Sequence, residues 1–221
     1  DGRIKSGHDD DGSSTPAWVL PPIANGVDVE ALGAAGHARW SFALMLGRIC
    51  PEKGQHLALA AARQAEMPLL LAGQIYPYPE HLTYFAEAVA PLLGKRHRFI
   101  GRRGFAQKRR LLAAARCVLI PSQVAETSSL VAMEALACGT PVIAFAIGAL
   151  PEILDHGRTG FLVGNVAEMA DAIRHADEID PQTCRQVARE RFALARTTAA
   201  YLELYARLAA GNVAARPAAA A

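Results

Sequence analysis

The chain has 221 residues, of which 52% are hydrophobic and 20% are charged, and its formal net charge at pH 7 is +2. These values are typical of one soluble globular domain with extensions. A charge this small excludes a general attraction to nucleic acid or to an anionic membrane, so any anion site has to be local. The aromatic content of 6% also argues against stacking platforms for nucleic-acid bases.

The cysteines carry no metal or redox signature. Cys50, Cys117, Cys138 and Cys184 are not paired at metal-binding or redox spacing. We therefore expect thiols that are mostly buried, in a reducing, cytoplasmic compartment, with the inner membrane face as a second location. We expect neither a transmembrane segment nor a signal peptide.

Short apolar runs alternate with helical patterns along most of the chain. Apolar runs bounded by Gly or Pro are typical of strands that are buried on both faces of a parallel sheet. The runs are 18–20, 42–46, 69–72, 98–100, 117–120, 142–145 and 160–163. The helices are predicted at 55–66, 80–93, 106–115, 129–138 and 166–177, with three further helical stretches that end at 197–208. This order predicts a doubly wound, Rossmann-like α/β sheet, in which ligands bind beyond the carboxyl ends of the strands.

The chain is expected to have three parts. Residues 1–16 are polar and predicted to be a disordered tail, residues 17–208 form the α/β domain, and residues 209–221 form an Ala-rich tail. In the first tail, His8 and the three aspartates after it are either a weak metal site or a solvated acidic stretch.

Two cations follow the strand predicted at 42–46. Gly47 and Arg48 come directly after the strand, and Lys53 stands just before the next helix. Such a loop places a planar Arg fork and a Lys point charge on one anion, and a diphosphate uses both. The alternative is a solvated loop whose charges pair with Glu52 or bind nothing.

Two carboxylates follow the strand predicted at 117–120. Glu126 lies in the loop, and Glu134 lies on the second turn of the helix predicted at 129–138. Because that helix is apolar, we expect Glu134 to be partly buried, where a carboxylate needs a partner. The positions favour hydrogen bonds to sugar hydroxyls, with Glu134 near a ribose and Glu126 near a hexose. The alternative is that neither carboxylate binds a ligand. One would then only complement the helix dipole, and the other would be an ordinary surface acid.

The start of the same helix is expected to bind an anion between the two carboxylates. The backbone N–H groups of Ser129, Leu130 and Val131 have no helical partner there, and the helix dipole adds to their attraction. We expect Thr127 or Ser128 to cap the helix with its side chain.

Several further segments complete a pattern in which each motif is weak alone. The segments are 25–28 (NGVD), 47–48 (GR), 51–54 (PEKG), 99–101 (FIG), 126–141 (ETSSLVAMEALACGTP), 151–153 (PEI) and 156–163 (HGRTGFLV). Taken together, from about residue 18 to residue 208, they resemble the C-terminal domain of the family 4 glycosyltransferases, a large retaining group with the GT-B fold. The pair of glutamates separated by seven residues makes the combination specific.

The resemblance implies a role for each matching residue. Arg48 and Lys53 would hold the donor diphosphate, Glu134 would bind the ribose, and Glu126 would bind the transferred sugar. The loop with Arg102 and Arg103 would lie beside the base. The implied catalytic residues are Arg48, Lys53 and Glu126, and the implied donor-binding residues are Gly47, Arg103, Ser128, Ser129, Leu130, Val131 and Glu134. No metal and no cofactor are expected, because the cations and the helix N-terminus stabilise the leaving phosphates.

The sequence departs from the family in two ways. Many members have an aromatic residue and a Gly where this chain has Ser128 and Ser129. The side chain of Ser129 therefore stands where the backbone approaches the sugar, which is expected to affect donor choice. The family also has an N-terminal domain that holds the acceptor, and we expect this chain to lack it, since only about 16 residues precede the first predicted strand.

These features predict the donor-binding half of a glycosyltransferase that transfers a hexose from a nucleoside diphosphate sugar with retention. Its partners would be the donor, an unidentified acceptor and a separate acceptor-binding domain. Two alternatives stay open: a non-catalytic or remnant module that binds nucleotide sugar, and a sugar-nucleotide epimerase-like domain. A dinucleotide-dependent dehydrogenase fits least, because no G-x-G-x-x-G follows a predicted strand.

Overall fold

A computed structural model describes residues 18–20, 22–34, 40–210 and 216–217. The tail predicted at 1–16 lies outside the described residues. The chain divides into two compact units, one formed by residues 24–199 and the other by the described parts of 1–23 and 200–221. Within the described residues, no helix combines the length and the apolar character that crossing a membrane requires.

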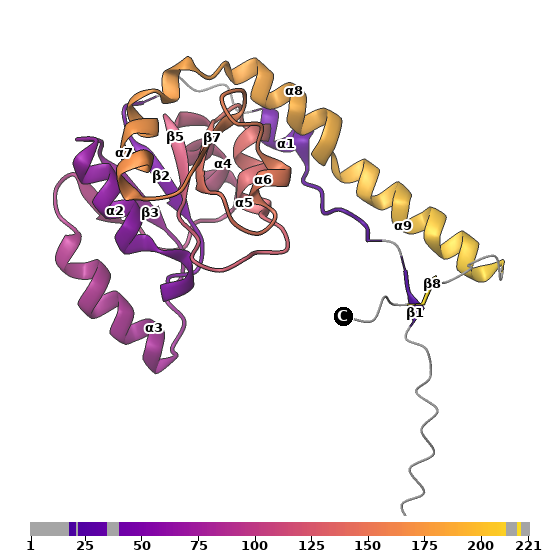
Figure 1. The fold of residues 1–221 in the computed structure, drawn as a ribbon, viewed down its shortest axis with the longest axis horizontal. Coiled ribbons are helices and arrows are strands. Elements are labelled where there is room, and N and C mark those ends of the chain that lie inside the picture. The colour runs from indigo at the N-terminus through magenta and orange to yellow at the C-terminus, as the bar shows by residue number, and fades with distance from the viewer. Residues whose placement is uncertain (1–17, 21, 35–39, 211–215, 218–221) are drawn as a thin grey trace, which may run out of the picture. The chain divides into compact units, whose positions relative to one another are not determined.

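The larger unit contains a parallel sheet of six strands in the order β4-β3-β2-β5-β6-β7 (Figure 1). Successive strands run outward from β2 to β4 on one side and from β5 to β7 on the other, so the topological switch point lies between β2 and β5. The fold is the predicted doubly wound α/β sheet. The strands are β2 (Ala43–Leu46), β3 (Leu69–Ala72), β4 (His97–Phe99), β5 (Cys117–Ile120), β6 (Val142–Phe145) and β7 (Gly160–Val163).

Helices cover both faces of this sheet, because alternate side chains of each strand point to opposite faces. On β5, for example, Val118 belongs to one hydrophobic core and Leu119 to the other. The first core is closed by α1 (Val29–Gly33), α4 (Phe105–Ala114), α5 (Leu130–Ala137), α6 (Leu150–Ile153) and α8 (Pro181–Phe192). The second core is closed by α2 (Gln55–Gln64), α7 (Val166–Arg174) and the turns Phe85–Val89 and Ala176–Glu178.

The sequence predicts one continuous helix over 80–93, and this is wrong. The segment begins as α3 (Pro79–Tyr84), widens to a π-helical turn at Phe85–Val89 and tightens to a 3-10 turn at Ala90–Leu92. Pro91 explains the change, because it lacks an N–H and its ring clashes with an α-helical turn before it.

The apolar run at 18–20 was predicted to join the parallel sheet, and this is wrong. Its residues form β1 (Trp18–Val19), which pairs antiparallel with β8 (Arg216–Pro217) in the smaller unit. The helix α9 (Leu194–Ala209) includes the predicted stretch 197–208.

Candidate functional site

The predicted site residues gather at the carboxyl ends of the strands around the switch point. A pocket of about 300 Å³ opens there, which is small but within reach of a nucleotide-sized ligand. It is lined by residues after β2, β3 and β4 and by one face each of α4 and α5. The lining residues are Leu46, Gly47, Arg48, Ala72, Gly73, Gln74, Tyr76, Arg102, Arg103, Lys108, Val131 and Glu134.

Six of the predicted residues line this pocket, namely Gly47, Arg48, Arg102, Arg103, Val131 and Glu134. They come from loops and a helix far apart in the sequence, so the fold has brought them together. The guanidinium of Arg103 also donates a hydrogen bond to the Ile100 carbonyl, which holds its side chain close to its own loop.

Lys53 and Glu126 form an ion pair beside the pocket rather than lining it. Lys53 Nζ lies 2.7 Å from Glu126 Oε1, and the side chains are only 24% and 15% exposed. The Ser122 hydroxyl donates a hydrogen bond to the same carboxylate oxygen. The loop after β2 and the loop after β5 are thereby tied to each other across the switch point.

Glu134 forms the second ion pair of the site, as its apolar helix requires. Lys108 Nζ lies 2.5 Å from Glu134 Oε1, and the Glu134 side chain is 15% exposed. Lys108 is not among the site residues that the sequence predicts. The signal that could have found it is its place on the helix after β4, whose first turns face the same sheet edge.

The start of α5 is arranged differently from the prediction. The N-cap residue is Ser129, and neither Thr127 nor Ser128 caps the helix; Ser129 makes no side-chain capping bond. Its extended backbone starts the helix one residue later than expected, and the Ser128 hydroxyl is buried without a hydrogen bond to any described residue.

The unpaired N–H groups expected at the start of this helix are nevertheless present. The first helical hydrogen bond runs from the Met133 N–H to the Ser129 carbonyl at 3.2 Å, so the N–H groups of Leu130 and Val131 have no helical acceptor. Val131 lines the pocket, whereas Leu130, Ser128 and the buried Ser129 do not.

Two glycines let these loops approach closely. Gly54 has a left-handed φ of +70°, and a Cβ there would meet the Pro121 carbonyl at 2.3 Å. Gly148 has a φ of +59°, and a Cβ would meet the Glu126 backbone nitrogen at 2.5 Å. Any other residue at either position would push the loop after β5 away from its neighbours.

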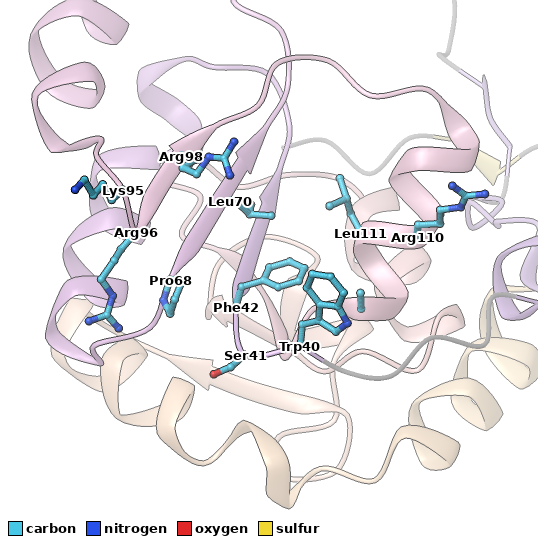
Figure 2. A pocket seen from close by; sticks show the side chains of 11 residues that line it. Trp40, Ser41, Phe42, Pro68, Leu70, Lys95, Arg96, Arg98, Arg110 and Leu111 are labelled. Atoms are coloured by element: carbon cyan, nitrogen blue, oxygen red, sulfur yellow. The ribbon is translucent and has the colours of Figure 1, made fainter.

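A larger pocket, of about 580 Å³, lies at the opposite end of the strands (Figure 2). Apolar residues such as Trp40, Phe42 and Leu70 line it together with arginines such as Arg98. No carboxylate lines this pocket, so it has no counterpart of Glu134 for a sugar hydroxyl. The carboxylate predicted to contact a ribose, Glu134, lines the smaller pocket.

Comparisons with known proteins agree on one class. Residues 42–176 match the family model described as "Glycosyl transferases group 1". Alpha-maltose-1-phosphate synthase of Mycobacterium tuberculosis is 32% identical over 221 aligned positions, which cover 85% of this chain and 57% of that protein.

Solved structures extend the comparison. AviGT4, a glycosyltransferase involved in avilamycin A biosynthesis, matches with a TM-score of 0.73 and 29% identity over 86% of this chain and 59% of that one. Anabaena HepE in complex with UDP-glucose matches with a TM-score of 0.72 and 23% identity over 83% of this chain and 56% of that one, which shows a shared fold. The chain therefore spans little more than half the length of each of these proteins.

Proposed function

Because the chain belongs to the glycosyl transferases group 1 family, we propose that it binds the nucleoside diphosphate sugar for a retaining hexosyltransferase. It would serve as the C-terminal, donor-binding half of a GT-B enzyme. The observation that carries the proposal is the pocket at the switch point, where Arg48 and Glu134 face one cavity. A cation for the diphosphate and a carboxylate for a sugar diol are the two groups that such a donor needs.

The charges around the pocket suit a nucleoside diphosphate. Arg48, Arg102 and Arg103 lie along its wall. The N-terminus of α5 adds backbone N–H groups and the positive end of its dipole. Glu134 is oriented by Lys108 and accepts hydrogen bonds from the ribose hydroxyls in the proposed complex.

The proposed reaction breaks the bond between the anomeric carbon and the diphosphate while the acceptor hydroxyl attacks. Negative charge grows on the departing phosphates, and Arg48, Lys53 and the α5 N-terminus stabilise it. Each preorganised donor of this kind contributes about 3 kcal/mol. The leaving phosphate itself helps to take the acceptor proton, on the same face of the sugar that it leaves.

Glu126 is assigned to the transferred hexose. Its carboxylate is held by Lys53 and Ser122, which fixes where its oxygens lie. The Ser122 hydroxyl still donates to this carboxylate when Lys53 turns to the diphosphate, which weakens it as a nucleophile, so we assign it to sugar binding rather than to a covalent step. Donor binding is proposed to need no metal and no cofactor, and the acceptor is proposed to bind a separate domain.

The experiment is calorimetric titration of the chain with UDP, GDP and ADP in the presence of a chelator. Selective binding of one nucleotide by the wild type, lost in the double variant Arg48→Ala, Glu134→Gln, is the expected result. Arg98→Ala is the matched control, because it removes a cation from the pocket at the other end of the sheet. Equal binding of all three nucleotides, or binding that the double variant retains, would overturn the proposal.

A further inference from the structure

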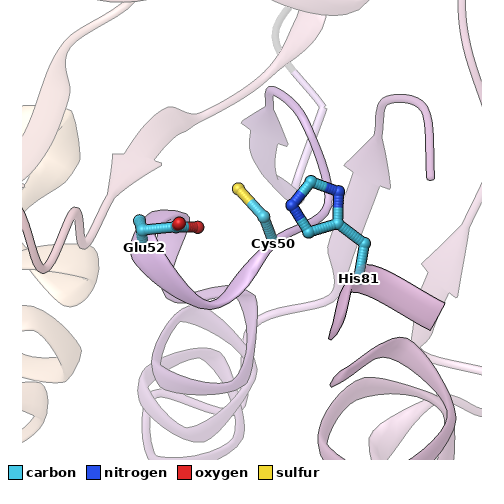
Figure 3. A group of neighbouring side chains, drawn as sticks. All are labelled: Cys50, Glu52 and His81. Carbon is cyan, nitrogen blue, oxygen red and sulfur yellow. The ribbon is translucent and has the colours of Figure 1, made fainter. Parts of the chain in front are cut away.

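Three side chains with metal-ligating atoms meet next to the donor site without lining it. Cys50 lies at the end of the loop after β2, Glu52 lies in the 3-10 turn Pro51–Lys53, and His81 lies in α3. Their ligand atoms all lie within 4.8 Å of one another. Figure 3 shows the Cys50 sulfur between the Glu52 carboxylate and the His81 ring. We propose that Cys50, Glu52 and His81 bind one Zn²⁺ ion.

The distances suit this ion. Zinc binds sulfur at about 2.3 Å, imidazole nitrogen at about 2.0–2.1 Å and carboxylate oxygen at about 2.0–2.2 Å, usually in tetrahedral geometry. Ligand atoms in such a site lie roughly 3.3–3.7 Å apart. Shifts of about 1 Å in these side chains therefore close the site. A set of one sulfur, one nitrogen and one oxygen favours zinc over Mg²⁺ or Ca²⁺, which prefer oxygen ligands alone.

An unsatisfied oxygen of Glu52 points to the same conclusion. Its Oε2 is buried and has no hydrogen-bond partner among the described residues. A buried polar atom left unpaired costs free energy, so this oxygen calls for a ligand, and a cation supplies it. His81 is 8% exposed, and Figure 3 shows its Nε2 on the side of the ring that faces the Cys50 sulfur, with Nδ1 on the far side.

Packing of the three residues on one another does not account for the cluster. Burial and the neighbouring Glu52 carboxylate raise the pKa of the Cys50 thiol, which donates to the Arg48 carbonyl at 3.9 Å. These contacts leave Glu52 Oε2 without a hydrogen-bond partner among the described residues. The His81 ring is held in place by an edge-to-face contact with Tyr78, at 5.2 Å between ring centroids.

The ion would fasten the donor loop to α3. Cys50 and Glu52 stand between Arg48 and Lys53, the two cations proposed for the diphosphate. The Gln55 side chain already holds this loop by donating to the Arg48 carbonyl at 2.7 Å. None of the three ligands lines the donor pocket, so the zinc is a structural clip and takes no part in sugar transfer. The site does not depend on the proposed function.

The test is metal binding by the purified, chelator-treated chain. Zinc affinity is measured by competition with a chromophoric chelator, and Co²⁺ is added separately to look for thiolate-to-metal absorption. We expect one Zn²⁺ per chain, a Co²⁺ band that proves thiolate ligation, and a higher Tm with zinc. Cys50→Ser and His81→Gln should each weaken zinc binding by about 100-fold or more.

Two control variants match these changes elsewhere in the fold. Cys138→Ser removes another buried thiol, and His97→Gln removes another histidine whose Nδ1 is buried without a partner. Both should keep wild-type zinc affinity. A weak site at His8 lacks a thiol and gives no charge-transfer band.

Two results would overturn the proposal. One is a wild type without the thiolate band, a measurement that needs no variant. The other is equal zinc affinity in the wild type, Cys50→Ser and His81→Gln, with Tm values in chelator showing that all three are folded. Nucleotide titration in chelator is independent of both results, so failure of the zinc site and failure of the donor site are distinguishable.

Discussion

Lys53 and Glu126 are joined by an ion pair of 2.7 Å that spans the switch point of the sheet. Lys53 follows β2 and Glu126 follows β5, and these two strands are neighbours at the centre of the sheet. The pair fixes the two loops to each other. It also means that the cation proposed for the diphosphate and the acid proposed for the hexose restrain one another.

Substitution of Lys53 and substitution of Glu126 should have different effects on ligand binding. Lys53→Gln removes a charge-assisted hydrogen bond to the diphosphate, so the nucleoside diphosphate and its sugar conjugate should both bind about tenfold or more weakly. Glu126→Gln leaves Lys53 free for phosphate, so the diphosphate should bind to this variant at least as tightly as to the wild type. The sugar conjugate should no longer bind more tightly than the diphosphate. Calorimetry with both ligands checks this. Weakened diphosphate binding in Glu126→Gln would contradict the assignment.

Glu134 should determine recognition of the ribose. A wild-type preference of about tenfold for the ribonucleotide over its 2′-deoxy form is expected, because a hydrogen bond to a charged group contributes about 1.5–3 kcal/mol. Glu134→Gln should lose that preference. Lys108→Met, which removes the partner of Glu134 but not the carboxylate, should keep it. Competition between the two nucleotides measures the preference, and its survival in Glu134→Gln would exclude a ribose contact.

Gly148 and Gly157 form a matched pair for testing the packing of the Glu126 loop. Both have positive φ, of +59° and +75°, but a Cβ at Gly157 meets nothing within 4 Å. Gly157→Ala should therefore cost only the left-handed backbone strain, about 1 kcal/mol. Gly148→Ala should cost about 1–3 kcal/mol more, because its Cβ meets the Glu126 backbone. Urea unfolding measures the free energy of unfolding of both variants. An equal decrease in the two would show that the Glu126 loop moves to make room for the added Cβ at no cost.

His56 should make the folded state less stable in mild acid. Burial lowers the pKa of His56, whose Nδ1 lies 2.9 Å from the Tyr84 hydroxyl. The unfolded chain takes up a proton near pH 6.5, and the folded chain does so only at lower pH. The free energy of unfolding should therefore fall as pH drops below about 6.5 and level off below the folded pKa. Between about pH 7.5 and about pH 5.5, the free energy of unfolding of His56→Gln should fall less than that of the wild type. An equal fall in both proteins would show that His56 does not cause the loss of stability in acid.

Much of the sheet could be predicted because its strands are short, apolar and bounded by Gly, Pro or charge. The strands β3, β5, β6 and β7 have the predicted bounds. The run at 18–20 looks the same in sequence, but apolar character alone does not say which strand is the partner. Its partner, Arg216–Pro217, lies in a segment with no strand pattern.

Residues could be placed near this sheet edge from the sequence where they lie in a loop after a predicted strand, as Arg48 and Glu126 do. Lys108 was missed because its role depends on how α4 packs against α5, where it meets Glu134. The Cys50, Glu52 and His81 cluster was missed for a similar reason. Cys50 and Glu52 alone do not form a metal-binding motif in the sequence. The third ligand, His81, comes from α3, and only the fold places it beside the loop.

The ion pair between Lys53 and Glu126 has a consequence for the end of the proposed catalytic cycle. In the proposed reaction, the donor takes Lys53 from Glu126 as it binds. When the nucleoside diphosphate leaves, Glu126 returns to Lys53 at 2.7 Å, so no bare charge is left behind. The protein's own carboxylate then competes with the spent product for the same cation, and this exchange favours product departure over product retention.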